Sequence, residues 1–144
     1  MASRRLVLDA NILIRAVLGK RVRAIIVAHA AEAEFFVPEV AYADALHYLP
    51  QILIKQGRAA EAEGVRDYFA QLQRVVLPVS EEAYVAQRAG ALARIEKRDP
   101  DDWPILAAAL ALACPIWTED NDFFGTGVPT WTTDRVEIYL KRAD

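Results

Sequence analysis

Aspartates that could bind a metal ion together occur in four separate segments of the chain. Asp9 follows the apolar run "RRLVL", Asp44 lies in "VAYADALHYL", Asp102 begins "DWPILAAALAL", and Asp120 lies in "WTEDNDFF". If these carboxylates converge, their mutual repulsion requires a cation. Oxygen ligands without a histidine or cysteine set at zinc spacing indicate Mg²⁺ or Mn²⁺. Such a site suits phosphodiester hydrolysis, because a divalent ion activates water and offsets transition-state charge.

Each of these acids also has a purely structural interpretation. Asp9 taken alone is more typical of a cap for the helix that follows it. Asp44 lies near an apolar helical face, where a carboxylate needs a partner or a metal; that face consists of Ala41, Ala45 and Tyr48. Thr118 can cap a short helix through residue 124. One cap needs one side chain, yet this segment offers four acceptors: Thr118, Glu119, Asp120 and Asp122.

The prolines of "RDPDDWPILAAALAL" fix the register of one helix. A proline is tolerated in the first turn of a helix, because its missing N–H would have no partner there. Pro104 therefore places the start of this helix near Asp101 or Asp102. We predict that Asp101 is the cap, that Asp102 is the metal ligand in the opening turn, and that Asp99 is an exposed loop acid.

Short apolar runs alternate with stretches of helical period along the chain. We expect strands at residues 4–8, 34–38, 74–79, 114–118 and 128–133. We expect helices at residues 11–18, 22–33, 39–56 (kinked or split at Pro50), 58–73, from 80 onward, from about 102 to 113, and at 134–142. Strands separated by such helices favour a parallel sheet with helices on both faces. Because ligands bind beyond the carboxyl ends of parallel strands, Asp9, Asp120 and Asp122 fall where a site is expected.

The length of 144 residues, with 54% hydrophobic and 26% charged residues, predicts one soluble globular domain (residues 1–144). A net charge of −3 excludes a general basic coat for nucleic acid. The local cluster Lys20, Arg21 and Arg23 is either a solvated surface or an RNA-binding patch. No apolar run predicts a membrane span or a secretory signal, so we expect a cytoplasmic protein. Cys114 is expected to be a small core residue.

In their order along the chain, these motifs resemble those of PIN-domain nucleases: Asp-x-Asn after the first strand, the acid in "PEVAYADAL", the acid opening "DDWPILAAALAL", and "WTEDNDFF". The chain is similar in particular to the small VapC-type toxins of prokaryotic toxin–antitoxin pairs, over essentially its whole length. The resemblance implies an α/β fold, a three-layer α/β/α sandwich around a central, mostly parallel sheet of four to five strands. It also implies an Mg²⁺- or Mn²⁺-dependent endoribonuclease that cleaves single-stranded or structured RNA, forms a homodimer and is inhibited by an antitoxin.

Carried over by position, the resemblance assigns a role to seven residues. The catalytic, metal-binding acids are Asp9, Asp44, Asp102 and Asp120. The supporting residues are Asn11 and Thr118, which orient the site, and the auxiliary acid Asp122.

Two departures from the family pattern keep alternatives open. The second acid of the family is most often glutamate, so the shorter Asp44 reaches a metal through water or from a closer helix, and Glu39 is the alternative second acid. Trp103 is expected to pack at the rim of the groove, with base stacking as the alternative.

Two other functions are rivals of the nuclease. The first is a haloacid-dehalogenase-type phosphatase, which also has an aspartate at the end of its first strand; it needs a second aspartate where this chain has Asn11, which argues against it. The remaining rival is a non-catalytic PIN-like module that binds RNA or a protein partner.

Overall fold

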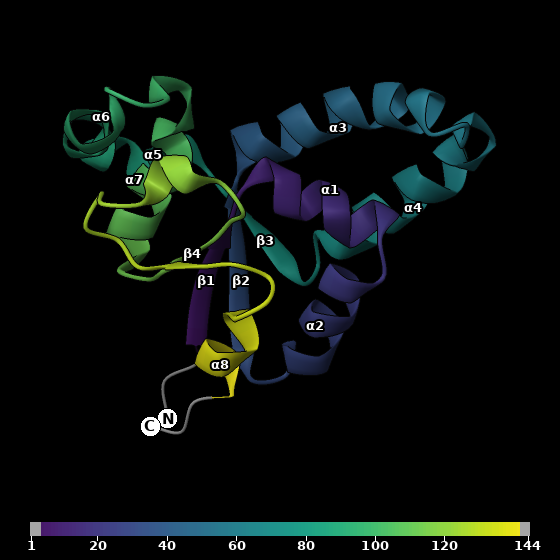
Figure 1. Cartoon of the computed structure of the whole chain (residues 1–144), viewed down its shortest axis with the longest axis horizontal. Helices are drawn as coiled ribbons and strands as arrows, with labels where there is room; N and C mark the ends of the chain where they lie inside the picture. Colours follow the sequence, from purple (N-terminus) through teal and green to yellow (C-terminus); the bar gives the residue numbers. More distant parts are fainter. Residues whose placement is uncertain (1–3, 142–144) are drawn as a thin grey trace.

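The computed structural model describes residues 4–141 and has a five-stranded, all-parallel sheet at its centre (Figure 1). The strand order is β3-β2-β1-β4-β5, so the first strand of the chain lies in the middle of the sheet. The strands are β1 Arg4–Leu8, β2 Ala33–Pro38, β3 Val76–Val79, β4 Ile116–Trp117 and β5 Thr130–Trp131. The predicted parallel sheet is confirmed, and its last two strands are shorter than expected.

Helices cover both faces of this sheet, as right-handed βαβ connections require. On one face lie α5 (Glu81–Tyr84), α6 (Arg88–Ile95) and α7 (Trp103–Leu112). On the other lie α1 (Ala10–Leu18), α2 (Arg21–His29), α3 (Glu39–Lys55) and α4 (Ala62–Leu72) (Figure 1). The remaining elements are α8 (Val136–Leu140) and the 3-10 turns η1 (Ala59–Glu61), η2 (Val85–Gln87), η3 (Pro100–Asp102) and η4 (Asn121–Phe123). The predicted three-layer α/β/α sandwich is therefore confirmed.

Several helices differ from the predicted ones. Of the two outcomes predicted at Pro50, the split does not occur: α3 is one helix of 17 residues that includes the proline, with Leu49 and Leu53 on either side of it buried in the core. The segment after Ser80 divides into α5, η2 and α6, and the Ser80 hydroxyl makes no capping hydrogen bond. The predicted end of the last helix at residue 142 lies outside the described residues.

The alanine-rich helix α7 packs along the centre of the sheet. Its residues 104–109 are all buried, and the small side chains let the helix approach β1 and β2 closely. Cys114, just beyond α7, is buried and free of disulfide bonds, as predicted for a core residue. Because α7 is fixed by this packing, Asp102 before its first turn is held at one edge of the sheet.

In the part of the chain described, no helix combines the length and apolar character needed to cross a membrane.

Candidate active site

The carboxyl ends of β1 and β4 bring Asp9 and Thr118 together. In the paired strands Leu8 lies opposite Trp117, so the residues that follow them meet at the same edge of the sheet. The Thr118 hydroxyl donates a short hydrogen bond to Oδ2 of Asp9. The other oxygen, Oδ1, accepts the backbone N–H of Ile12 at 2.9 Å and so caps α1. The buried Asp9 side chain thus caps a helix and lies beside Thr118 at the same time.

Thr118 also fixes the position of Asp120. The Thr118 hydroxyl oxygen accepts the Asp120 backbone N–H at 2.9 Å, and the Asp120 carboxylate accepts the backbone N–H of Asp122 at 2.9 Å. Asp120 is therefore the cap of η4, a single 3-10 turn. The prediction that Thr118 caps a helix through residue 124 is wrong, because its hydroxyl bonds to Asp9 and to the Asp120 backbone instead.

The capping role predicted for Asp101 at the start of α7 is wrong. Pro104 lies in the first turn, as predicted, and α7 begins at Trp103. Asp101 is exposed and is not the cap; its backbone N–H donates to the carboxylate of Asp99 at 3.1 Å. Asp102 occupies the N-cap position of α7, but its side chain makes no capping bond. Its Oδ2 atom is buried and finds no hydrogen-bond partner within residues 4–141, so this oxygen is available to a ligand.

Asp99 lies among the clustered acids, a position that the sequence did not predict. The prediction of an exposed loop acid is wrong: Asp99 is half-buried, and one carboxylate oxygen each of Asp99, Asp102 and Asp122 lies within 4.8 Å of the others. Oxygens at this spacing are compatible with one shared cation. The sequence did carry a signal, because an aspartate directly before a proline is typical of a cap followed by proline at the first helical position, here Pro100.

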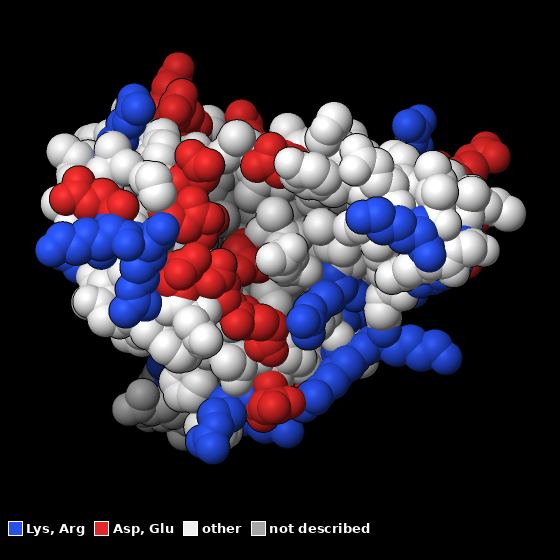
Figure 2. All heavy atoms as spheres, turned by 45° about the horizontal axis from the view of Figure 1, so that its top comes forward, with Lys and Arg blue, Asp and Glu red and all other residues white. Residues whose placement is uncertain are grey.

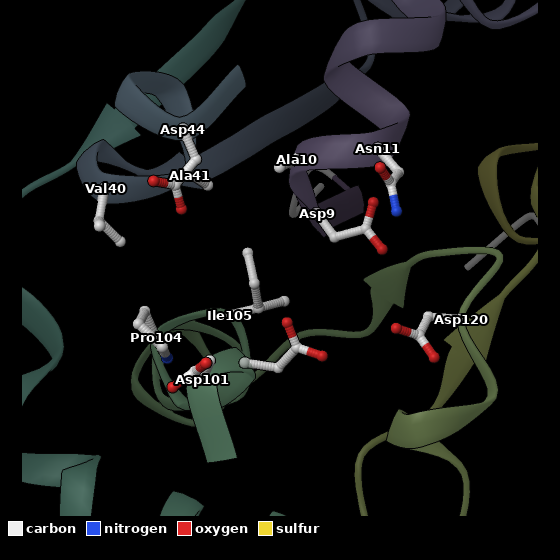
Figure 3. A pocket seen from close by; sticks show the side chains of 11 residues that line it. Asp9, Ala10, Asn11, Val40, Ala41, Asp44, Asp101, Pro104, Ile105 and Asp120 are labelled. Carbon is white, nitrogen blue, oxygen red and sulfur yellow. The ribbon is translucent and has the colours of Figure 1, made fainter. Parts of the chain in front are cut away.

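Asp9, Asp102 and Asp120 line a hollow of about 90 Å³ at the edge of the sheet, which Asp99 and Asp122 do not line. Figure 3 shows Asp9, Asp44 and Asp120 approaching this hollow from three different elements. A band of acidic side chains also runs beside a hollow in the molecular surface (Figure 2). The polar residues that line the pocket are Asp9, Asn11, Asp44, Asp101, Asp102 and Asp120. The pocket thus brings together the four acids proposed as ligands and the proposed neighbour Asn11.

Asp44 reaches this hollow from the solvent side of α3. Ala41 and Ala45 are buried, but Tyr48, which was assigned to the same apolar face, is 51% exposed. The placement of Asp44 near the core face is therefore wrong, because the apolar face is narrower than Tyr48 suggested and Asp44 is exposed. Glu39, the alternative second acid, lines a neighbouring hollow and not this one.

Trp103 is half-buried next to Asp102 and lines the hollow that neighbours the acidic one. Its ring packs against the Tyr84 ring at a centroid distance of 5.7 Å, and the Arg88 guanidinium lies 4.9 Å from its centroid. The predicted packing role is therefore confirmed.

The crowding of carboxylates makes the charged forms unfavourable. Burial first, and then neighbouring acids, raise the pKa of Asp102 from 3.8 to about 7; those acids are Asp99, Asp120, Asp9 and Asp122. Burial also raises the pKa of Asp9, although the hydrogen bond from Thr118 acts in the opposite direction. A cation would lower these pKa values, because it favours the charged form of each acid.

The donor set fits a hard divalent cation. The polar side chains that line the hollow are five carboxylates and the Asn11 amide, and the buried Oδ2 of Asp102 lacks the partner that a buried polar atom normally has. Oxygen ligands of this kind are the ones that Mg²⁺ and Mn²⁺ prefer. His29, the buried histidine, instead bonds to Glu137 at 2.9 Å, away from the acids.

The residues predicted to bind RNA have three different surroundings. Arg21 forms an ion pair with Asp134 at 2.9 Å. The Arg23 guanidinium donates to carbonyl oxygens at the end of α1 and lies 4.0 Å from the centroid of the Tyr68 ring. Lys20 is exposed and forms no ion pair within the described chain. The basic cluster of the sequence is therefore divided between structural contacts and a free cation.

In a parallel α/β/α fold, carboxylates gathered beyond the strand ends stand where such folds bind their ligands. Residues 7–141 match the model of the PIN domain, so the chain belongs to the PIN-domain family. PIN domains are generally metal-dependent nucleases, and the acidic cluster of this chain is suited to bind such a metal. Among curated proteins, none matches the sequence.

Proposed function

We propose that this PIN domain is an Mg²⁺- or Mn²⁺-dependent endoribonuclease that hydrolyses single-stranded RNA. The observation that carries the proposal is the buried Oδ2 of Asp102, which lacks a partner in the described chain and belongs to a pocket shared with Asp9 and Asp120. A buried carboxylate oxygen without a partner is destabilising. Its presence in this pocket therefore favours a bound ligand that comes from outside the chain.

The proposed roles follow from the contacts of each side chain. Asp9, Asp44, Asp102 and Asp120 would hold one cation, and Asp99 and Asp122 would hold a second one together with Asp102. When bound, divalent cations lower the pKa of an attacking water and offset the charge that develops on phosphate. Thr118 holds Asp9 and the Asp120 backbone at fixed positions through its one hydroxyl. Asn11 lines the same pocket and can orient a phosphate oxygen with its amide.

The deciding experiment incubates purified protein with single-stranded RNA in Mn²⁺, Mg²⁺ or EDTA. We expect cleavage with either ion, none with EDTA, and none for Asp9→Asn or Asp102→Asn. Asp67→Asn, on the exposed surface of α4, is the matched control and should cleave like the wild type. Cleavage that survives EDTA, or that both site variants retain, would overturn the mechanism.

We also propose that the protein is the toxin of a toxin–antitoxin pair, working as a homodimer. The support is the resemblance of the ordered motifs to VapC-type toxins, together with membership of the PIN family. Expression should then arrest growth, Asp102→Asn should abolish the arrest, and an antitoxin-sized reading frame should lie immediately upstream of the gene. RNA binding without cleavage, and a melting temperature that no metal shifts, would favour the rival non-catalytic binding module instead.

A further inference from the structure

A second groove, larger than the acidic hollow, lies at the other end of α1. Its volume is about 470 Å³, and it runs between the α1–α2 turn and the segment from η1 into α4. Its lining includes Lys20, Arg23, Arg58, Tyr68 and a single acid, Glu61. The groove therefore carries net positive charge in a chain whose net charge is −3.

The cations of this groove are held in place without being fully neutralised. Arg23 donates to carbonyl oxygens of α1, which are uncharged, and stacks on Tyr68. Arg58 donates to the Leu18 carbonyl and forms a bidentate ion pair with Glu61, whose side chain is 51% exposed. Both side chains of this pair are partly exposed, at 32% and 51%, so an incoming phosphate can exchange with the Glu61 carboxylate at Arg58.

Helix α1 connects this groove directly to the acidic hollow. Asp9 and Asn11 at its start line the hollow, and Lys20, just beyond its end, lines the groove. Arg15 stands between them: it is exposed, lies one turn after Asn11 on the same face, and forms no ion pair with any residue from 4 to 141. In Figure 2 basic side chains lie across the hollow from the acidic band.

The length of α1 matches a short piece of nucleic acid. A nine-residue helix is about 13 Å long, which corresponds to about four nucleotides of a stacked strand. Without its metal ions the carboxylate cluster repels a polyanion, and cations beside the cluster favour binding of the strand. Arg15 on α1, Lys20 just beyond its end, and Arg58, which donates to the Leu18 carbonyl at that end, can supply these cations.

We infer that Arg15, Lys20 and Arg58 form a phosphate-binding track along α1 that holds single-stranded RNA a few nucleotides from the scissile bond. Tyr68 at the far end offers a ring face close to the track, although Arg23 covers one side of it. Arg21 lies on α2 and not on α1, and it does not line the groove, so the proposed track leaves it out. The identity of the bound strand rests on the proposed ribonuclease function.

The test measures binding of a fluorescein-labelled oligouridylate of about 12 nucleotides, a length within the range that single-strand-binding domains cover. Anisotropy is recorded in EDTA at several salt concentrations, so that no cleavage occurs. We expect Arg15→Ala/Lys20→Ala to bind more weakly and to reduce the slope of log affinity against log salt by about 1.4, since each phosphate contact contributes about 0.7 for single strands.

The matched control is Arg74→Ala/Lys141→Ala, which removes the same charge from the other end of the sheet. Both residues are exposed. Arg74 lies shortly before the first residue of β3. Lys141 follows α8, which lies near the start of β1 because the Tyr139 hydroxyl donates to the carbonyl of Arg5. This control should keep the wild-type slope. All variants are compared by circular dichroism to show that they fold.

An unchanged slope for Arg15→Ala/Lys20→Ala would overturn the track, as would equally tight binding of an oligoglutamate, which would indicate a surface for an acidic protein. The outcome is separate from that of the cleavage assay. A reduced slope in EDTA would support the track even if the wild type failed to cleave RNA with Mn²⁺. Conversely, metal-dependent cleavage with an unchanged slope would leave the proposed function standing without the track.

Discussion

Replacing Asp102 by asparagine is expected to stabilise the metal-free protein while it abolishes cleavage. Burial and neighbouring carboxylates raise the pKa of Asp102 from 3.8 to about 7. Between pH 3.8 and about pH 7, Asp102 keeps its proton in the folded protein but has released it in the unfolded chain. The free energy of unfolding therefore falls as the pH rises through this window. The shift of about three pH units corresponds to about 4 kcal/mol. We reduce this to about 2 kcal/mol, because water screens the half-buried side chain.

Asparagine cannot ionise, so Asp102→Asn should have the same Tm as the wild type near pH 4 and a higher Tm than the wild type at about pH 8. The expected gain is about 4–8 °C, since 1 kcal/mol corresponds to about 2–4 °C in a domain of this size. The assay is thermal unfolding in EDTA across this pH range, with the exposed Asp101→Asn as the control that should follow the wild type. A difference independent of pH, or a variant that melts below the wild type at about pH 8, would refute the electrostatic reasoning.

Three further substitutions test the site and its supporting loop. Thr118→Val removes the hydroxyl that bonds two acids, and RNA cleavage should fall about 10- to 100-fold, whereas Thr118→Ser should retain most activity. Asp99→Asn should weaken Mn²⁺ binding in a calorimetric titration, and unchanged affinity would exclude Asp99 as a ligand. Gly127→Ala at φ +88° would displace the Arg94 guanidinium from its 2.8 Å hydrogen bond to the Thr126 carbonyl, and should lower Tm more than Gly57→Ala, whose Cβ meets open space at φ +68°.

The register of α7 could be predicted because it follows from a local rule. A proline in the first turn leaves no broken hydrogen bond, so Pro104 alone fixes where the helix begins, and the structure agrees. The positions of Asp9 and Thr118 follow equally locally, because each comes directly after a buried strand and parallel strands end at one edge. Short-range rules were therefore enough to place these residues at the same edge.

The cap before α7 was misassigned because the chain contains a second proline signal. Pro100 begins a 3-10 turn of its own, so the acid before it, Asp99, is a cap and Asp101 is not. A single 3-10 turn is too short to produce a hydrophobic period, so the sequence pattern merges it with the following helix. The position predicted for Asp44, near the core face of α3, was wrong for another reason. The rotation of α3 about its axis depends on which of its apolar residues find a partner in the core.

The basic cluster shows where local reasoning ends. Lys20, Arg21 and Arg23 are neighbours in sequence, yet Arg21 pairs with Asp134, more than a hundred residues away, and Arg23 turns back onto α1. Arg58 joins Lys20 in one groove from a distant segment. Such pairings are decided by the packing of helices, and a single sequence does not encode them in any spacing.

The clustered aspartates share a placement that explains how the fold tolerates them without metal. Asp9, Asp99, Asp102 and Asp120 all stand at N-cap positions, where the helix dipole and free N–H groups favour an anion. Three of the four accept a backbone N–H through the carboxylate. Asp102 alone does not, and it is the acid with a buried, unpartnered oxygen and a pKa raised to about 7. Because the protein satisfies the other three carboxylates itself, the charge of Asp102 is the one that most depends on a cation, and metal binding should be most sensitive to this residue.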